Sequence, residues 1–245
     1  MESIDKIQGI IEKKEELLRY TDVSPAVIRR LPRYHRYLGD LIRAGKMRIS
    51  SKELASMMGV TASQIRQDLN CFGGFGQQGY GYNVKYLHGK IGELLGTTEG
   101  FRAVIIGAGN LGRALAATHM FDRRGVSRIA MFDTNQALVG TEIYGIPVYH
   151  VDRLGSFCEE NRIDIAVLTV PKEAAKGVTD VLLSAGIKGI WNFANMELTV
   201  EDENVIVENI HLGDSLMTLC YDLRSRQQQS LQGEQKYEND VFLRQ

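Results

Sequence analysis

The stretch FRAVIIGAGNLG, residues 101–112, decides the fold of this 245-residue chain. Its first half, Phe101 to Ile106, is short, apolar and partly β-branched, which is typical of a buried parallel strand. Three glycines follow with the spacing G-x-G-x-x-G, and residues 111–121 have the pattern of a helix. A strand, this glycine loop and a helix, in that order, predict a site for the pyrophosphate of a dinucleotide.

Strands and helices continue to alternate after the glycine loop, which predicts an α/β fold with a doubly wound parallel sheet of the Rossmann type. Further strands are expected at residues 128–132, 146–149, 164–170, 188–193 and 205–207, with helices near 151–161 and 172–185. Asp133 ends the second strand, 21 residues beyond Gly112. A carboxylate there accepts hydrogen bonds from ribose hydroxyls and repels a 2′-phosphate, so we predict NAD(H) rather than NADP(H).

Ligands of open α/β sheets bind at the carboxyl ends of the strands. The candidate cofactor-binding residues therefore lie in the glycine loop, after the second strand and at two later strand tips: Gly107, Ala108, Gly109, Asn110, Leu111, Gly112, Asp133, Thr134, Thr169, Val170, Pro171, Asn192, Phe193 and Ala194. An ordinary strand-end turn explains any single residue of the two later tips equally well.

No acid or base group accompanies these strand tips, although hydride-transfer enzymes place one beside the nicotinamide. Lys172 is expected to begin a surface helix, and His119 and His211 fit packed or surface histidines better than catalysts. Only 38 residues follow Val207, which leaves no room for a separate substrate domain. We therefore predict no enzymatic activity. The alternative is an NAD-dependent oxidoreductase with a helical cap at its N-terminus.

Charge divides the chain into two parts. Residues 1–86 contain 14 Lys and Arg against 9 Asp and Glu, net +5, and residues 87–245 contain 15 against 21, net −6. A basic first domain suggests a polyanionic partner, although a solvated surface explains the charge alone equally well.

The three cysteines are dispersed and the five histidines form no cluster, so we expect no metal site. The sequence shows no signal peptide and no apolar run of about 20 residues, which favours a cytoplasmic protein without membrane contact.

Residues 24–82 predict a winged-helix DNA-binding domain. Ser24-Pro25 starts a helix that runs to Gly45, kinks or restarts at Pro32 and exposes an arginine-rich stripe. Capping boxes at Ser50 and Thr61 open two short helices, which together form a helix-turn-helix, and a glycine-rich segment follows as a β-hairpin wing. The alternative is a small helical module that binds protein. The candidate DNA-binding residues are Arg29, Arg33, Arg36, Ser50, Ser51, Thr61, Ser63, Gln64, Arg66, Gln67, Gln77, Gln78 and Tyr80.

The two ends of the chain complete the domain organisation. Residues 1–20 fit an amphipathic helix of unassigned function. Residues 212–223 predict a helix that is apolar on much of its surface and needs either its own domain or a second subunit to cover it. The polar remainder is expected to be partly disordered. We thus divide the chain into a winged-helix domain (1–86), a Rossmann domain (87–211) and a C-terminal helix with its tail (212–245).

The chain closely resembles the Rex family of redox-sensing transcriptional repressors over about residues 24–225. TASQIRQDLNCFGGFGQQGYGY (61–82) together with GAGNLG (107–112) carries the resemblance, with support from VIRRLPRYHRYL (27–38), RISSKEL (48–54), AVLTVP (166–171) and AGIKGIWNF (185–193). It implies a homodimer that exchanges its C-terminal helix, binds an inverted-repeat operator in double-stranded DNA and releases it when NADH binds, while NAD⁺ competes and permits DNA binding.

Two positions depart from the pattern expected in family members from aerobes. Those members have a Tyr in the helix after the glycine loop and an Asp at the start of the exchanged helix, and the matching residues here are Thr118 and His211. The departure predicts a ligand response with different contacts. A family paralogue that senses NADH without binding DNA is a further alternative, against which the arginine stripe argues.

Overall fold

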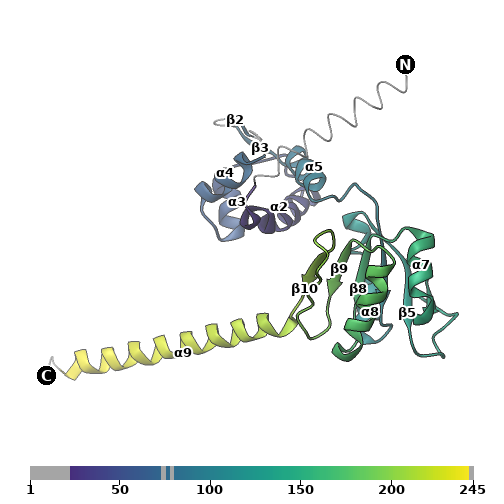
Figure 1. Cartoon of the computed structure of the whole chain (residues 1–245). Coiled ribbons are helices and arrows are strands. Elements are labelled where there is room, and N and C mark those ends of the chain that lie inside the picture. Colours follow the sequence, from purple (N-terminus) through teal and green to yellow (C-terminus); the bar gives the residue numbers. More distant parts are fainter. Residues whose placement is uncertain (1–22, 73–75, 78–79, 243–245) are drawn as a thin grey trace, which may run out of the picture. The chain divides into compact units, whose positions relative to one another are not determined.

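Two units, residues 1–99 and 100–245, make up the computed structural model of the chain, which describes residues 23–72, 76, 77 and 80–242 (Figure 1). The helix expected at residues 1–20 lies outside the described residues. None of the helices in the described ranges is long and apolar enough to cross a membrane.

The first unit combines helices with a small antiparallel sheet. Its helices are α2 (Pro25–Arg43), α3 (Ser51–Met58), α4 (Ala62–Asn70) and α5 (Val84–Leu94). Its sheet has the order β1-β3-β2 and consists of β1 (Arg48–Ile49), β2 (Gly76–Gln77) and β3 (Gly81–Asn83). One core joins the four helices with β1 and β3, and Leu31, Tyr34 and Leu38 of α2 are fully buried in it.

The two predicted capping boxes differ in the structure. At α3 the box is complete, because the Ser50 hydroxyl accepts the Glu53 N–H and the Glu53 carboxylate accepts the Ser50 N–H. At α4 the Thr61 hydroxyl accepts the Gln64 N–H at 3.1 Å, but the Gln64 amide donates to Asp68 at 2.7 Å. Only the first half of the second box is therefore formed.

Helix α5 extends the first unit beyond the expected boundary at residue 86. The helix packs against α2, and its Leu87 and Ile91 are fully buried in the core of the first unit. The division therefore falls between Glu99 and Gly100, because α5 covers apolar surface of α2. Helix α2 runs through Pro32 as a single element, so the helix does not restart there.

The second unit contains a seven-stranded sheet in the order β10-β9-β8-β4-β5-β7-β6. All its strand pairs are parallel except β6 with β7. Its elements are β4 (Phe101–Ile106), α6 (Asn110–Ala117), η1 (Asp122–Arg124), β5 (Val126–Asp133), β6 (Glu142–Ile143), β7 (Ile146–His150), η2 (Val151–Arg153), α7 (Leu154–Asn161), β8 (Ile165–Leu168), α8 (Lys172–Ser184), β9 (Gly189–Asn192), β10 (Ile206–Asn209) and α9 (Leu212–Phe242).

Alternating residues of β4 face two cores, as a strand buried on both faces requires. Val104 and Ile106 pack with apolar residues of α7 and of α8 on one face of the sheet. Ile105 packs with Ala116 of α6 and with Phe121 on the other face. The Rossmann-like, mostly parallel sheet predicted from the alternation of strands and helices is thereby confirmed.

Two helices have ends that differ from the expected ones. Helix α6 ends at Ala117 rather than near Phe121. At this end of the helix, Arg128 of β5 donates to the carbonyl oxygens of Ala116 and Thr118. Helix α9 continues to Phe242 through the tail that was expected to be partly disordered. Residues 224–245 contain six Gln and three Arg and no proline, a composition that favours a helix.

Candidate functional sites

The carboxyl ends of the parallel strands are aligned at one edge of the sheet. The strand register places Phe132, Ile106, Leu168, Asn192 and Asn209 in one row across β5, β4, β8, β9 and β10. The glycine loop and the predicted strand tips follow this row directly. Residues distant in sequence are thus brought to the edge where open α/β sheets bind ligands.

Close approach of the backbone requires glycine in the loop after β4. Gly107 has φ of +98°, and a Cβ atom there would lie 2.7 Å from the carbonyl oxygen of Thr169. A Cβ atom on Gly112 would lie 1.9 Å from the Gly107 carbonyl oxygen. The Thr169 hydroxyl donates toward the carbonyl oxygens of Ile106 and Gly107, which holds the loop against β8.

A cavity of about 240 Å³ opens beside this loop. Its lining joins the glycine loop to the ends of β5 and β8 and to η2 and α8: Ile106, Gly107, Gly109, Phe132, Asp133, Thr134, Val151, Thr169, Val170, Pro171, Ala174 and Val178. The apolar wall of Val151, Ala174 and Val178 was missed from the sequence, because only the fold brings η2 and α8 to β5. Such a wall beside a carboxylate can hold a nucleoside.

Asp133 is held at the glycine loop by two backbone donors. Its Oδ2 accepts the Ala108 N–H at 2.7 Å, and its Oδ1 accepts the Asn135 N–H at 2.8 Å. Each carboxylate oxygen has a further lone pair that can accept a hydroxyl. Helix α6 begins after Gly109 without a side-chain cap, so its first N–H groups can bind an anion.

Some predicted cofactor residues belong to the glycine loop or α6 but do not line the cavity itself. Ala108 and Gly112 are buried within the loop, and neither they nor Asn110 and Leu111 belong to the cavity lining. Arg113, which sequence reasoning missed, donates from Nε to the Ala108 carbonyl oxygen at 2.8 Å. It therefore places a cation at the glycine loop.

The tip of β9 also lies outside the cavity lining. Asn192 is fully buried: its amide nitrogen donates to the Met196 carbonyl oxygen and to Asn209 Oδ1, and its Oδ1 accepts the Ala194 N–H. Phe193 packs against Trp191 with ring centroids 4.7 Å apart. The Asn192 side chain therefore has a structural role, because its amide nitrogen and oxygen hydrogen-bond to other residues of the protein.

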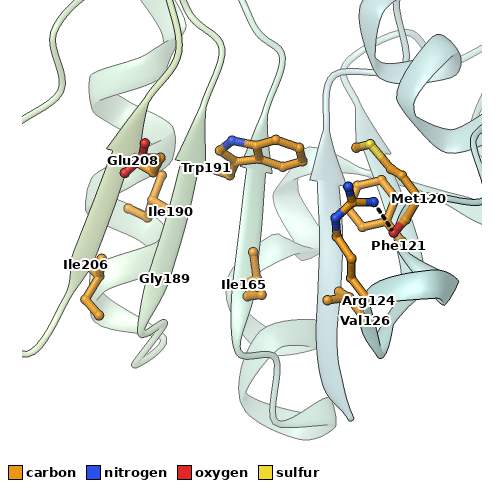
Figure 2. A pocket seen from close by; sticks show the side chains of 10 residues that line it. All are labelled: Met120, Phe121, Arg124, Val126, Ile165, Gly189, Ile190, Trp191, Ile206 and Glu208. Atoms are coloured by element: carbon orange, nitrogen blue, oxygen red, sulfur yellow. Dashed lines mark hydrogen bonds between the residues drawn. The ribbon is translucent and has the colours of Figure 1, made fainter. Parts of the chain in front are cut away.

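An apolar groove lies on the sheet face of β8, β9 and β10 (Figure 2). Its volume is about 460 Å³, and Figure 2 shows it extending from Ile206 and Glu208 across Trp191 and Ile165 to Phe121 and Arg124. Helix α9 of the same unit exposes large apolar side chains: Leu212, Leu216, Met217, Leu219, Tyr221 and Leu223 are each more than half exposed.

In the first unit, Arg66 and Ser51 meet at the predicted helix-turn-helix. The Arg66 Nη1 donates to the Ser51 hydroxyl at 3.1 Å, which joins α4 to the first residue of α3. Ser63 and Gln67 are exposed on α4, while Ile65 and Leu69 are buried on its opposite side. The exposed face of α4 is thus polar and basic.

Gln64 belongs to an internal network rather than to this exposed face alone. Asp68 is fully buried and accepts hydrogen bonds of 2.7–2.8 Å from Arg30, Tyr34 and Gln64. Burial raises the pKa of the Asp68 carboxyl, but the three donors outweigh it, and the pKa lies below its ordinary value. Burial also raises the pKa of Tyr34.

The arginine stripe of α2 has mixed roles. Arg29, Arg33 and Arg36 are exposed, but Arg33 donates to the Met58 carbonyl oxygen at the end of α3, and the Arg36 guanidinium lies 5.7 Å from the Tyr37 ring centroid. Arg33 therefore also satisfies a helix terminus.

In the predicted wing, Tyr80 is 70% exposed and Arg48 lies 5.9 Å from its ring centroid. Sequence reasoning missed Arg48, which β1 places beside β3. Gln77 lies in β2, and Gln78 is outside the described residues.

Thr118 and His211 have hydrogen-bond partners of their own. The Thr118 hydroxyl donates to the Leu115 carbonyl oxygen at 2.9 Å, and His211 Nε2 lies 2.9 Å from Glu197 Oε2. Among the described residues, no group of three His, Cys, Asp or Glu side chains could hold a metal ion.

The fold and these sites define a class of two-domain proteins that join a helical DNA-binding region to a Rossmann-like nucleotide-binding domain. Two family models match the chain: "CoA binding domain" at residues 98–196 and "Putative DNA-binding protein N-terminus" at residues 22–70. The redox-sensing transcriptional repressor Rex of Clostridium botulinum strain Alaska E43 is 52% identical over 205 residues, which are 84% of this chain and 97% of that protein. The chain belongs to the Rex family of transcriptional repressors, which are not enzymes.

Further relatives agree with this assignment. Rex of Clostridium botulinum strain Hall is 54% identical over 198 residues, 81% of this chain and 94% of that protein. The crystal structure of RSP with β-NAD⁺ and operator DNA has a TM-score of 0.79 and 50% identity, covering 87% of this chain and 99% of RSP. The structure of RSP with β-NADH has a TM-score of 0.79 and 47% identity, covering 86% and 98%. The alternative hypothesis of an NAD-dependent oxidoreductase was therefore wrong.

Proposed function

We propose that this chain is a homodimeric repressor that binds an inverted-repeat operator and releases it when NADH binds. One observation carries the proposal: the cavity that joins the glycine loop to Asp133 belongs to the same chain as the Arg66–Ser51 pair of the helix-turn-helix. The nucleotide is a signal that leaves unchanged, since the family consists of repressors.

The cavity supports a pose for the adenosine half of NAD(H). The pyrophosphate binds the free N–H groups at the start of α6, and Asp133 accepts the ribose hydroxyls. The adenine lies against Val151, Ala174 and Val178. The Asp133 carboxylate repels a 2′-phosphate, so the site prefers NAD(H) over NADP(H).

The first unit supports a winged-helix mode of DNA binding, with α4 in the major groove. Ser63, Arg66 and Gln67 then face base edges and phosphates. The other candidate residues would contact the sugar-phosphate backbone of the DNA and so orient the domain on it: Arg29, Arg33, Arg36, Ser50, Ser51, Thr61, Gln64, Gln77, Gln78 and Tyr80. Phosphate contacts set affinity and base contacts set the operator sequence.

Two exposed apolar surfaces of the second unit support the dimer. Helix α9 exposes Leu216, Met217 and Leu219, and the groove beside Trp191 offers about 460 Å³. We propose that α9 of each subunit covers the groove of its partner. Burial of a large apolar side chain contributes about 1.5–3 kcal/mol, so a few such contacts stabilise an exchanged dimer.

The regulatory step is a difference in NADH affinity between two dimer conformations. A hundredfold loss of operator affinity requires NADH to bind the DNA-incompetent form about 2.7 kcal/mol more tightly. If NADH bound both dimer conformations with equal affinity, it would not change their relative populations.

Operator binding measured against the NADH/NAD⁺ ratio tests this function. Fluorescence anisotropy of a labelled inverted-repeat duplex, at constant total nucleotide, should show release by NADH and retention with NAD⁺. NADH binding by a protein that binds no duplex would instead support a paralogue that senses NADH without DNA. Operator binding that ignores the nucleotide ratio would refute the proposal.

A further inference from the structure

Arg30 of α2 is bound to α4, the second helix of the helix-turn-helix, by two parallel hydrogen bonds. Its Nε donates to Asp68 Oδ2 at 2.7 Å, and its Nη2 donates to Asp68 Oδ1 at 2.8 Å. A two-bond contact between a guanidinium and a carboxylate fixes the plane and the direction of the guanidinium. The orientation of this cation is therefore set by α4, although the residue belongs to another helix.

The contact with Asp68 leaves one edge of the Arg30 guanidinium unused. A guanidinium has five N–H groups, and the two bonds to Asp68 use one on Nε and one on Nη2. The Arg30 side chain is 33% exposed, whereas that of Asp68 is fully buried. Within the described residues, no remaining Arg30 nitrogen is a buried atom without a partner. The unused edge, with both N–H groups of Nη1, is thus accessible to an acceptor from outside the protein.

Arg30 is held in this position before any ligand binds. Asp68 also accepts hydrogen bonds from the Tyr34 hydroxyl and from Gln64 Nε2, both at 2.7 Å, so its carboxylate is fixed from three sides. A free arginine side chain loses much rotamer freedom when a ligand immobilises it. Arg30 has already lost that freedom on folding, so an anion that binds its free edge meets a smaller entropic cost.

The free edge lies beside the N-terminal end of α4. Arg30 Nη2 and Gln64 Nε2 both donate to Asp68 Oδ1, and Gln64 is the third residue of α4. The first N–H groups of a helix have no carbonyl partner within the helix, and the helix dipole is positive at that end. A guanidinium edge and a helix N-terminus together match the charge and the acceptor oxygens of a phosphate.

We propose that Arg30 binds a phosphate of the operator backbone beside the N-terminal end of α4, through the guanidinium edge that Asp68 leaves free. The contact fixes the position of α4 along the duplex, while the exposed Ser63 and Gln67 face the base edges. A dimer makes it twice, once in each half-site. This inference rests on the proposed function, because it requires operator binding. The competing explanation is that Arg30 serves only to neutralise the buried Asp68.

The test removes the ion pair without a change in net charge. The main variant combines Arg30→Gln with Asp68→Asn, so an amide replaces each charged group. Arg30→Gln alone, which can still donate to Asp68, is the second uncharged variant if the double variant does not fold. Arg30→Lys keeps a cation at this position. The matched control combines Arg43→Gln with Asp40→Asn, because these two residues form an exposed ion pair on the same helix.

Two measurements report the phosphate contact. Anisotropy without NADH gives the Kd of an inverted-repeat duplex, selected by the wild-type protein from a random pool, over a series of salt concentrations. The second measurement uses duplexes in which a methylphosphonate replaces one phosphate of a half-site, position by position. This group has nearly the size of a phosphate but no charge, so it weakens the contacts of that phosphate. Melting curves and the NADH Kd show whether each variant is folded.

We expect the slope of log Kd against log salt to fall by about 0.9 for each lost phosphate contact, hence about twice that in a dimer. Operator and random duplexes should lose affinity by similar factors, because a phosphate contact carries no sequence information. One methylphosphonate position should cost the wild-type protein about tenfold and cost the double variant nothing further. Arg30→Lys should retain most of the slope, and the control pair should behave as wild type.

Three outcomes in folded protein would overturn the inference. The first is a salt slope that the charge-free variants leave unchanged. The second is a methylphosphonate scan in which wild type and variant lose affinity equally at every position. The third is a selective loss of operator over random DNA, because this indicates a displaced α4 and a purely structural role for Arg30. Wild-type protein that selects no inverted-repeat duplex would instead refute the proposed function itself, and the inference with it.

Discussion

Replacement of Asp133 by alanine should weaken NADH binding while it leaves operator binding intact. The carboxylate is oriented by the N–H groups of Ala108 and Asn135 at 2.7 and 2.8 Å, and it faces the cavity beside the glycine loop. A hydrogen bond to a charged group contributes about 1.5–3 kcal/mol. Loss of one such bond to a ribose hydroxyl therefore raises the NADH Kd roughly 10- to 150-fold.

The same substitution should reduce discrimination against NADPH, because it removes the charge that repels a 2′-phosphate. Titrations of NADH and NADPH by nicotinamide fluorescence give both affinities, and a melting curve confirms that the variant is folded. Asp180→Asn, an exposed carboxylate on α8, is the control. If alanine disturbs the loop, Asp133→Asn provides a second variant with the same volume. Unchanged NADH affinity in folded protein would remove Asp133 from the site.

Three further substitutions test the other parts of the molecule. Arg66→Ala should weaken operator binding by about 1–3 kcal/mol without a change in NADH Kd, and unchanged anisotropy at moderate salt would exclude α4 from the DNA contact. Asp68→Ala should destabilise the protein by about 1–3 kcal/mol in urea unfolding, because it leaves the buried Tyr34 hydroxyl and the partly exposed Arg30 guanidinium without their partner. Since the folded-state pKa of Asp68 is depressed, its wild-type contribution is present above the unfolded pKa of about 3.9 and is lost as pH falls through the folded pKa. Leu216→Glu on α9 should reduce the dimer mass in light scattering, whereas Gln227→Glu should not, and a dimeric Leu216→Glu protein would contradict the exchanged-helix dimer.

Local signals in the sequence predicted most of the elements. The apolar strand and three glycines at 101–112 specified the parallel sheet, because few backbones other than a tight strand-to-helix turn require glycine at both Gly107 and Gly112. The capping box at Ser50 predicted the start of α3, because its two partners, Ser50 and Glu53, are only three residues apart in the sequence. Such signals act over a few residues and can be read without the fold.

Long-range contacts decided what the sequence did not predict. The first unit extends to Glu99 because α5 buries Leu87 and Ile91 against α2. Gln64 and Arg33 were predicted only as DNA contacts, and the structure shows that each also has a partner within the protein: Asp68, four residues from Gln64, and the Met58 carbonyl oxygen, 25 residues from Arg33. Composition favoured partial disorder from residue 224 onward, whereas the helical propensity of the same residues continues α9 to Phe242.

The sequence by itself determined the fold class, the dinucleotide loop, the helix-turn-helix and the membership of a repressor family, because each depends on residue type at short, regular spacing. Only the tertiary structure decided which polar groups are free to meet a ligand. Asp133 faces a cavity. Asn192, an equally good candidate at a strand tip, instead makes its side-chain hydrogen bonds to other residues of the protein. Hydrogen bonds to distant partners make that difference, and no local pattern records them.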